Sequence, residues 1–358
     1  MHHAAKMSWL ALTVGAGAAA VSAGVAYQQL ESIRSRRRFA APGRFADAGG
    51  GRRLHYQCAG HGAPLVVLEA GIAASSLSWG LVQPEIASFA RVCSYDRAGL
   101  AWSDPGERVR SIDRFVADLR SVLHRTGAPP PYVLVGHSFG GLVIRAFART
   151  HPDETAGLIF VDTLHPEEWC DPSTEQRRML QGGVLLSEVG VCLARVGVVR
   201  ACLSLLSGGA PGVPRRVSRL FGPTAAALLD RIVGEVQKLP ASLLPTVQSH
   251  WSQPKAFRGM AQHLAALPFC SSRMPGSDAV LRRIPIVVLS AANRSERWLA
   301  ADAALAQLSS SGRHLISSRA GHWILLDDPS LVIDAVRDVV DRARSERDMH
   351  RFSYGGYA

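Results

Sequence analysis

The chain has 358 residues, the length of one large domain or of two smaller ones. Hydrophobic residues make up 47% of the composition and charged residues 19%, which excludes a disordered polymer, a collagen and a coiled coil. The formal net charge is +11, and almost all the cations are arginines that cluster unevenly. No helix-turn-helix, zinc-finger or RNA-binding signature accompanies this charge, so we expect no nucleic-acid partner.

Residues 1–30 are a candidate membrane segment. From Met7 onward these 24 residues carry no charged side chain, and as a helix they would span ~36 Å, enough for a hydrocarbon core of ~30 Å. Alanine and glycine dominate the middle of the run, which makes its insertion only weakly favourable. The alternative is a cleaved signal peptide, with Lys6 in the leading region and Ala23 or Ala26 at the cleavage position.

Residues 31–51 are expected to form a basic linker next to the membrane. Seven arginines lie between residues 31 and 53, against Glu31 and Asp47, which gives this stretch a net charge of +5. Such a cluster favours an anionic membrane surface as the partner. Arginines directly after an apolar run also resist translocation, so we expect a single-pass protein with its large C-terminal part in the cytoplasm. Export of that part is the alternative.

Short apolar runs rich in β-branched residues recur along the rest of the chain and predict buried parallel strands. These runs are Pro64–Ala70, Arg91–Tyr95, Tyr132–Gly136, Gly157–Val161, Pro285–Ser290 and His314–Ser317. Helical patterns lie between them, and this alternation predicts an α/β fold. The regularity lapses over residues 163–283, where we expect a helical cap insertion. The core would then comprise residues 52–162 and 284–345, with a C-terminal tail at 346–358.

A serine lies at a sharp turn between a predicted strand and a predicted helix. The segment Gly136-His137-Ser138-Phe139-Gly140 matches Gly-x-Ser-x-Gly directly after a strand. The backbone doubles back at such a turn, so a Cβ at Gly136 or Gly140 would clash where the hydroxyl is lifted into the open. An ordinary Gly-rich turn is the alternative. The strand–turn–helix context favours Ser138 as a nucleophile.

A serine hydroxyl is a poor nucleophile at neutral pH and needs an adjacent base. The chain has 13 histidines, and His322 lies just after the last predicted strand and before the final helix. In a parallel sheet, functional groups gather beyond the carboxyl ends of the strands. We therefore expect His322 to be the base.

At these motifs the chain resembles the α/β-hydrolase family, over about residues 52–342 without the cap. The resemblance rests on Leu68-Glu69-Ala70-Gly71, Tyr95-Asp96-Arg97-Ala98-Gly99, Gly136-His137-Ser138-Phe139-Gly140-Gly141, Phe160-Val161-Asp162 and Gly321-His322. The chain is also similar to a bacterial subgroup with an N-terminal membrane segment, an Arg-rich stretch and Pro-Gly, as at Pro42-Gly43. The resemblance implies an α/β-hydrolase fold and a catalytic triad of serine, histidine and an acid.

The position of the acidic residue differs in this chain from the family's commonest pattern, which places Asp after the strand predicted at Pro285–Ser290. That strand runs here into Ala-Ala-Asn, and the next carboxylate is Glu296. Some relatives take the acid from the end of the preceding strand, where this chain has Asp162. We favour Asp162, which would hold the His322 tautomer and stabilise its imidazolium. Glu296 is the alternative, as is a merely structural capping role for Asp162.

The resemblance also implies an oxyanion hole made by backbone N–H groups of Phe139 and of a loop residue, for which Ile72 is our candidate. The loop reads Glu-Ala-Gly-Ile in place of the family's frequent His-Gly, so a neighbour of Ile72 is the alternative donor. Asp96, Arg97 and Gly99 are expected to be structural and to hold the loop beside the site.

A serine nucleophile implies a covalent acyl-enzyme that water resolves, with no metal and no organic cofactor. We expect a hydrolase that cleaves a carboxylic ester of small-molecule or lipid-like type, with Val184–Leu206 as part of an acyl pocket or simply as helix core. Acyl transfer, perhydrolysis, and lactone, amide or thioester cleavage use the same residues. Ser138 excludes the aspartate nucleophile of the family's epoxide hydrolases and dehalogenases. A catalytically silent binding module is the alternative from another class.

Two cysteines bear on the cellular compartment. The six cysteines form no Cys-x-x-Cys motif and no group at zinc-ligand spacing. In the strand order that the resemblance implies, Cys58 and Cys93 lie on neighbouring strands and are expected to face one another. A disulfide between them would indicate an oxidising compartment, whereas the arginine cluster indicates the cytoplasm. We expect both thiols to be reduced.

Overall fold

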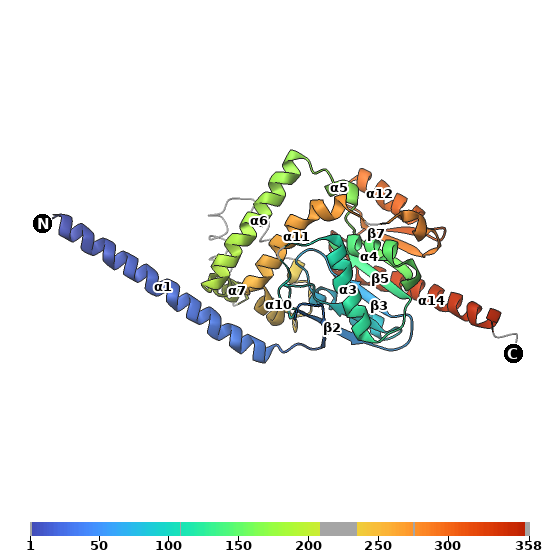
Figure 1. The fold of residues 1–358 in the computed structure, drawn as a ribbon, viewed down its shortest axis with the longest axis horizontal. Helices are drawn as coiled ribbons and strands as arrows, with labels where there is room; N and C mark the ends of the chain where they lie inside the picture. The colour runs from blue at the N-terminus through green and yellow to red at the C-terminus, as the bar shows by residue number, and fades with distance from the viewer. Residues whose placement is uncertain (1, 108, 208–234, 275, 355–358) are drawn as a thin grey trace.

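An eight-stranded sheet runs through the middle of the protein (Figure 1). The computed structural model describes residues 2–107, 109–207, 235–274 and 276–354. The strands are β1 Arg44–Asp47, β2 Arg53–Ala59, β3 Val66–Glu69, β4 Val92–Tyr95, β5 Tyr132–His137, β6 Thr155–Val161, β7 Ile286–Ala291 and β8 Arg313–Ser317. Their order across the sheet is β1-β2-β4-β3-β5-β6-β7-β8.

The sheet is parallel from β4 to β8, and β2 is antiparallel to both β1 and β4. Strands β3, β4, β5 and β7 are buried along their whole length, because helices cover both faces. This burial is why they occur as continuous apolar runs in the sequence. The predicted α/β fold with a mostly parallel sheet flanked by helices is confirmed.

Helices cover the two faces of the sheet and bury one apolar core on each face. One face is covered by α3 Ile112–Thr126, α4 Phe139–Thr150 and α12 Glu296–Gln307, and the other by α2 Gln83–Ala87, α13 Ile324–Asp327 and α14 Pro329–Tyr354. Short 3₁₀ turns lie at Ser76–Trp79, Pro152–Glu154 and Asp278–Arg283. The segment expected to be a C-terminal tail is helical as far as Tyr354, because α14 continues through it.

The chain between β6 and β7 contains helices joined by loops, and no strand, in the residues that the structure describes. Its helices are α5 Pro166–Trp169, α6 Thr174–Arg195, α7 Val198–Ser207, α10 Leu244–Trp251 and α11 Pro254–Ser272. The apolar run 184–206 forms two helices, because Gly197 adopts a φ of 76° and α7 leaves α6 at 91°. The part of the expected cap at residues 208–234 lies outside the described residues.

Helix α1, His2–Arg38, projects from the body of the protein at its N-terminal end (Figure 1). Residues 14–23 are exposed, whereas Gln28, Ser32 and Ser35 are buried against the cap helices. The basic segment expected to be a linker therefore consists largely of regular structure. Residues 31–38 continue α1, where a Glu31–Arg34 ion pair spans one turn, and residues 44–47 form β1.

Judged by length and apolar composition, no single helix in the described part of the chain passes as a membrane span. The bent pair of α6 and α7 passes this test only when the two helices are taken together. The transmembrane segment expected at residues 1–30 therefore stays a prediction.

Cys58 on β2 and Cys93 on β4 lie directly opposite each other in the sheet. The N–H of Asp96 donates to the carbonyl of His55, so these residues form a hydrogen-bonded pair of the antiparallel ladder. Because hydrogen-bonded and non-hydrogen-bonded pairs alternate, Cys58 and Cys93 form a non-hydrogen-bonded pair, in which Cα atoms are only ~4.5 Å apart. A disulfide is sterically possible at that separation, and both residues are free thiols in the structure.

The surroundings of Cys58 favour its thiolate. A hydrogen bond with Cys93 lowers the pKa of the Cys58 thiol, burial opposes this shift, and the charges of Arg91 and Arg44 lower the pKa further. The net pKa lies below its ordinary value. The partner thiol behaves in the opposite way, because burial raises the pKa of Cys93.

We expect Cys58 to be alkylated by iodoacetamide faster than the exposed Cys170 and Cys192 at about pH 7, because the thiolate is the reacting species. A lowered pKa means that the advantage shrinks as the pH rises to about 9, where ordinary thiols also ionise. Peptide mass spectrometry over a time course measures all three rates in one sample. Equal rates at the lower pH would show that Cys58 is not activated.

Candidate active site

Ser138 is the single residue between β5 and α4, and its backbone has φ 53° and ψ −119°. A Cβ added to Gly136 would lie 2.7 Å from the carbonyl carbon of Gly140. A Cβ added to Gly140 would lie 2.4 Å from the carbonyl oxygen of Glu69. Both contacts are closer than atoms tolerate, so this turn needs glycine at both positions. The sharp turn expected from the sequence is therefore present in the structure.

His322 joins Ser138 to Asp162. His322 follows β8, and its Nε2 lies 3.1 Å from Oγ of Ser138. Its Nδ1 lies 2.5 Å from Oδ2 of Asp162, the first residue after β6. A proton on Nδ1 donates to the carboxylate, and this tautomer leaves Nε2 free to accept the hydroxyl proton. Three residues that lie far apart in the chain thus meet at the carboxyl ends of the strands.

The carboxylate of Asp162 is buried and held by several partners. Its Oδ1 accepts a hydrogen bond of 3.1 Å from the N–H of Ala291 and lies 3.3 Å from Nη1 of Arg294. Burial raises the pKa of Asp162, but the hydrogen bond with His322 and the charge of Arg294 outweigh it and leave the pKa below its ordinary value. Asp162 therefore stays ionised at neutral pH. Glu296, the alternative acid, is exposed at the first residue of α12.

Arg294 is a residue of this site that the sequence analysis does not find. Its Nη2 donates to the carbonyl of Thr163 at 2.7 Å, and its Nε lies 3.0 Å from Oδ2 of Asp302 on α12. It therefore ties the end of β6 to the helix that follows β7. The only signal in the sequence is the position of Arg294 just after the strand where the family usually carries its acid. A single arginine in a loop is not enough to predict such a contact.

The two candidate oxyanion donors lie beside the serine. Phe139 is the first residue of α4, so its N–H has no carbonyl one turn back to pair with. The loop after β3 passes close by, because a Cβ added to Gly71 would lie 3.3 Å from Cβ of Ser138. Ile72 follows directly. The structure thus places the loop that carries Ile72 next to Ser138 and Phe139.

Arg97 stabilises the loop after β3 through hydrogen bonds. Only 2% of Arg97 is exposed, and its Nη1 donates to Oε1 of Glu69 at 2.7 Å and to the carbonyl of Ala70 at 2.6 Å. Its Nη2 donates to the carbonyl of Gly71. The Tyr95 hydroxyl donates to the other oxygen of Glu69. Arg97 therefore contacts the loop backbone and not Ser138, as expected for a structural residue.

We expect Arg97→Ala to lower the free energy of unfolding by ~3–5 kcal/mol, because Glu69 would keep a buried and unpaired charge. The double variant Arg97→Met/Glu69→Gln removes both charges and should lose less. Urea denaturation of the two variants and the wild type gives these values. Equal losses in the two variants would mean that packing, not the unpaired charge, carries the effect.

His137 is a further residue whose role the sequence does not reveal. Its ring lies tilted against those of His322 and Trp323, with centroids 4.8 Å and 5.0 Å away. Its Nε2 lies 2.9 Å from the backbone carbonyl of His322 and must carry the proton of that hydrogen bond. Burial, with a smaller effect of His322, lowers the pKa of His137 to about 3. His137 is thus a neutral donor that fixes the backbone of His322.

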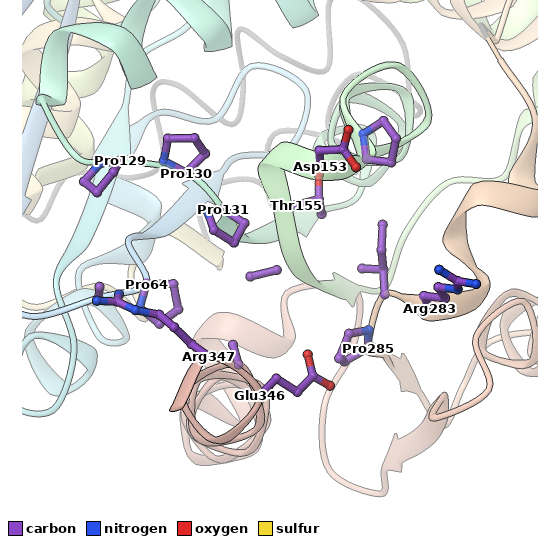
Figure 2. Close-up of a pocket in the computed structure, with 15 residues that line it drawn as sticks. Pro64, Pro129, Pro130, Pro131, Asp153, Thr155, Arg283, Pro285, Glu346 and Arg347 are labelled. Atoms are coloured by element: carbon purple, nitrogen blue, oxygen red, sulfur yellow. The ribbon is translucent and has the colours of Figure 1, made fainter. Parts of the chain in front are cut away.

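A cavity of about 490 Å³ lies at the amino ends of the parallel strands, away from the carboxyl ends where Ser138 lies. Figure 2 shows the residues that line it. Prolines preceding β3, β5 and β7 line it, together with Glu346 and Arg347 of α14. It contains none of the residues expected to be catalytic. Among the described residues, no group of His, Cys, Asp and Glu side chains is arranged to hold a metal ion. The expectation that the protein needs no metal or cofactor stays a prediction.

The strand order and the serine turn are those of the α/β-hydrolase fold, and known proteins share them. A family model described as alpha/beta hydrolase fold matches residues 64–184. An uncharacterized protein of Schizosaccharomyces pombe is 25% identical over 269 residues, which cover 72% of this chain and 43% of that protein. Mouse epoxide hydrolase 4 is 33% identical over 124 residues, 34% of each chain.

Among solved structures, a thermophilic esterase from Thermogutta terrifontis is similar with a TM-score of 0.57 at 20% identity, over 83% of this chain and 97% of that one. The chain spans less than half the length of the first curated relatives that it matches, namely 15%, 49% and 43%. The family model, the curated relatives and the solved structures together indicate an α/β-hydrolase family protein.

Proposed function

We propose that this protein is a serine hydrolase that cleaves a carboxylic ester through Ser138, His322 and Asp162. One observation carries the proposal: a single imidazole lies within hydrogen-bond distance of both the serine hydroxyl and a buried carboxylate. Nucleophile, base and orienting acid stand in this relation in serine hydrolases of unrelated folds. The similarity to esterases and epoxide hydrolases supports a hydrolytic enzyme.

The reaction proceeds in two halves. His322 takes the proton of Ser138 as Oγ attacks the ester carbonyl carbon, and Asp162 stabilises the imidazolium that forms. The N–H groups of Phe139 and Ile72 stabilise the negative oxygen of the tetrahedral intermediate. His322 then gives its proton to the departing alcohol, which leaves an acyl group on Ser138. A water molecule, activated by His322, releases the acid by the same steps in reverse.

The substrate we propose is a small-molecule or lipid-like ester. The fold provides a helical cap over the core, and its α6–α7 stretch offers apolar side chains for an acyl chain. Part of this stretch serves as packing, because a Cβ on Gly190 of α6 would lie 2.4 Å from the Phe257 ring. Residues 1–30 would attach the protein to a membrane, with the catalytic domain in the cytoplasm.

Labelling with a fluorophosphonate probe tests the proposal, because this probe reacts with an activated serine. The folded wild-type protein should be labelled at Ser138 and should then hydrolyse members of a p-nitrophenyl ester panel of graded acyl length. Folded protein that takes no label would favour the alternative, a silent binding module. Labelling without turnover of any ester would favour acyl transfer or another bond type.

A further inference from the structure

The C-terminal third of α1 is fixed to the cap by a buried polar network. Arg200 of α7 donates from Nε to Oε1 of Gln28 at 2.9 Å and from Nη1 to Oγ of Ser35 at 3.1 Å. The Gln28 side chain also donates to the carbonyl of Ser252 at 3.0 Å. The backbones approach closely as well, because a Cβ on Gly24 would lie 2.3 Å from the carbonyl of Val196. The C-terminal part of α1 therefore packs against the cap helices.

A cavity of about 480 Å³ lies at this contact, where α1 meets α7 and α10. Three guanidinium groups line it, those of Arg34, Arg38 and Arg200, against one carboxylate, that of Glu31. Glu31 pairs with Arg34 at 2.5 Å. The charged lining thus has a net charge of +2. Such an excess of cations around one cavity raises the local concentration of anions.

Arg200 is the unusual member of this lining. Only 7% of Arg200 is exposed, and its Nη2 is shielded from solvent and has no hydrogen-bond partner among the described residues. Its partners Gln28 and Ser35 are neutral, and no carboxylate among the described residues lies within salt-bridge distance of it. A buried cation without a compensating charge is costly, so an anion close to it is stabilising. Arg200 lines the cavity, so an anion bound there would offset its charge.

From this geometry we infer that the cavity is a binding site for a phosphate ester, with Arg200 at its base and Arg34 and Arg38 at its rim. Guanidinium groups bind phosphate oxygens through paired, charge-assisted hydrogen bonds. A tetrahedral phosphate has enough acceptor oxygens to engage more than one of the three arginines at once. The group would come from a lipid headgroup at the end of the apolar helix or from a soluble phosphate ester.

The test uses the full chain in a neutral detergent and two double variants of equal charge. Arg34→Ala/Arg38→Ala removes the two rim cations of the cavity. Arg36→Ala/Arg37→Ala removes two exposed arginines of the same turns that do not line it. Inorganic phosphate should raise the midpoint of thermal unfolding of the wild type and the second variant by roughly 2–4 °C, with chloride at equal ionic strength as the control. The first variant should show no such rise.

Vesicle flotation identifies the source of the phosphate. Phosphatidylcholine vesicles that contain phosphatidic acid are compared with ones that contain oleic acid, an anionic lipid without phosphate. A lipid headgroup site predicts about tenfold tighter binding to phosphatidic acid, lost only in Arg34→Ala/Arg38→Ala. A phosphate-dependent thermal shift without this lipid preference assigns the site to a soluble phosphate ester. Equal losses in both double variants, or no phosphate effect in either assay, would overturn the inference, and neither readout depends on hydrolysis.

Discussion

Replacement of Ser138 by alanine is expected to lower kcat/KM for an ester substrate by about a millionfold and to abolish fluorophosphonate labelling, because no other group can form the acyl-enzyme. The free energy of unfolding should change by no more than ~1 kcal/mol, since alanine keeps the Cβ of the buried serine and only the hydroxyl that contacts His322 is lost. Ester turnover and urea denaturation of the same preparation measure the two effects separately.

His322→Ala is the matched control for this prediction. The triad acts as a unit, so its loss should be comparable, and the double variant should be no worse than either single variant. Losses that add would mean that Ser138 and His322 act in different steps. Undiminished turnover by Ser138→Ala, in protein free of contaminating esterase, would rule out Ser138 as the nucleophile.

Asp162→Asn should lower kcat by about 10⁴-fold with little change in KM, because an amide no longer fixes the His322 tautomer or stabilises its imidazolium. The amide oxygen can still accept from Ala291, so the end of β7 keeps its partner. Steady-state kinetics on the best ester of the panel gives both constants, and circular dichroism verifies the fold.

Glu296→Gln is the control for the acid, and it should be nearly silent because Glu296 is exposed at the start of α12. A large loss in Glu296→Gln and a small one in Asp162→Asn would transfer the role to Glu296. Small losses in both variants would mean that neither residue is the acid.

Much of the fold is predictable because its signals are local. Strands buried on both faces produce continuous apolar runs, and those of β3 to β7 are visible without any structure. Strand β8 is also predicted, although only its last residue is buried. The short edge strand β1 is not predictable, because four residues in a basic segment carry no such run. The break between α6 and α7 is also missed, because Gly197 can continue or end a helix, and its left-handed backbone is fixed by contact with α1.

Some residues of the candidate site are likewise predictable from the sequence, and others are not. Ser138 and His322 carry local signals, a glycine-flanked turn and a place after the last strand. The acid carries no such local signal. Whether Asp162 or Glu296 takes this role depends on which carboxylate lies near His322 in the folded protein. Arg294 and His137 act through contacts that join distant segments, and no pattern of neighbouring residues encodes such contacts. Their surroundings become visible only when the sheet is assembled.

Ser138 and Asp162 share one further feature, a positive φ of 53° and 42°. Residues with a side chain lose roughly 1–3 kcal/mol in such conformations, and the surrounding structure must impose them. Glycine escapes this strain, so Ser138→Gly should unfold at a higher temperature than Ser138→Ala. A selection for thermal tolerance alone would thus favour glycine at this turn and eliminate the proposed nucleophile. Substitutions that make this protein more heat-resistant are therefore expected away from the strand ends. There, a gain in stability does not remove a residue of the proposed triad.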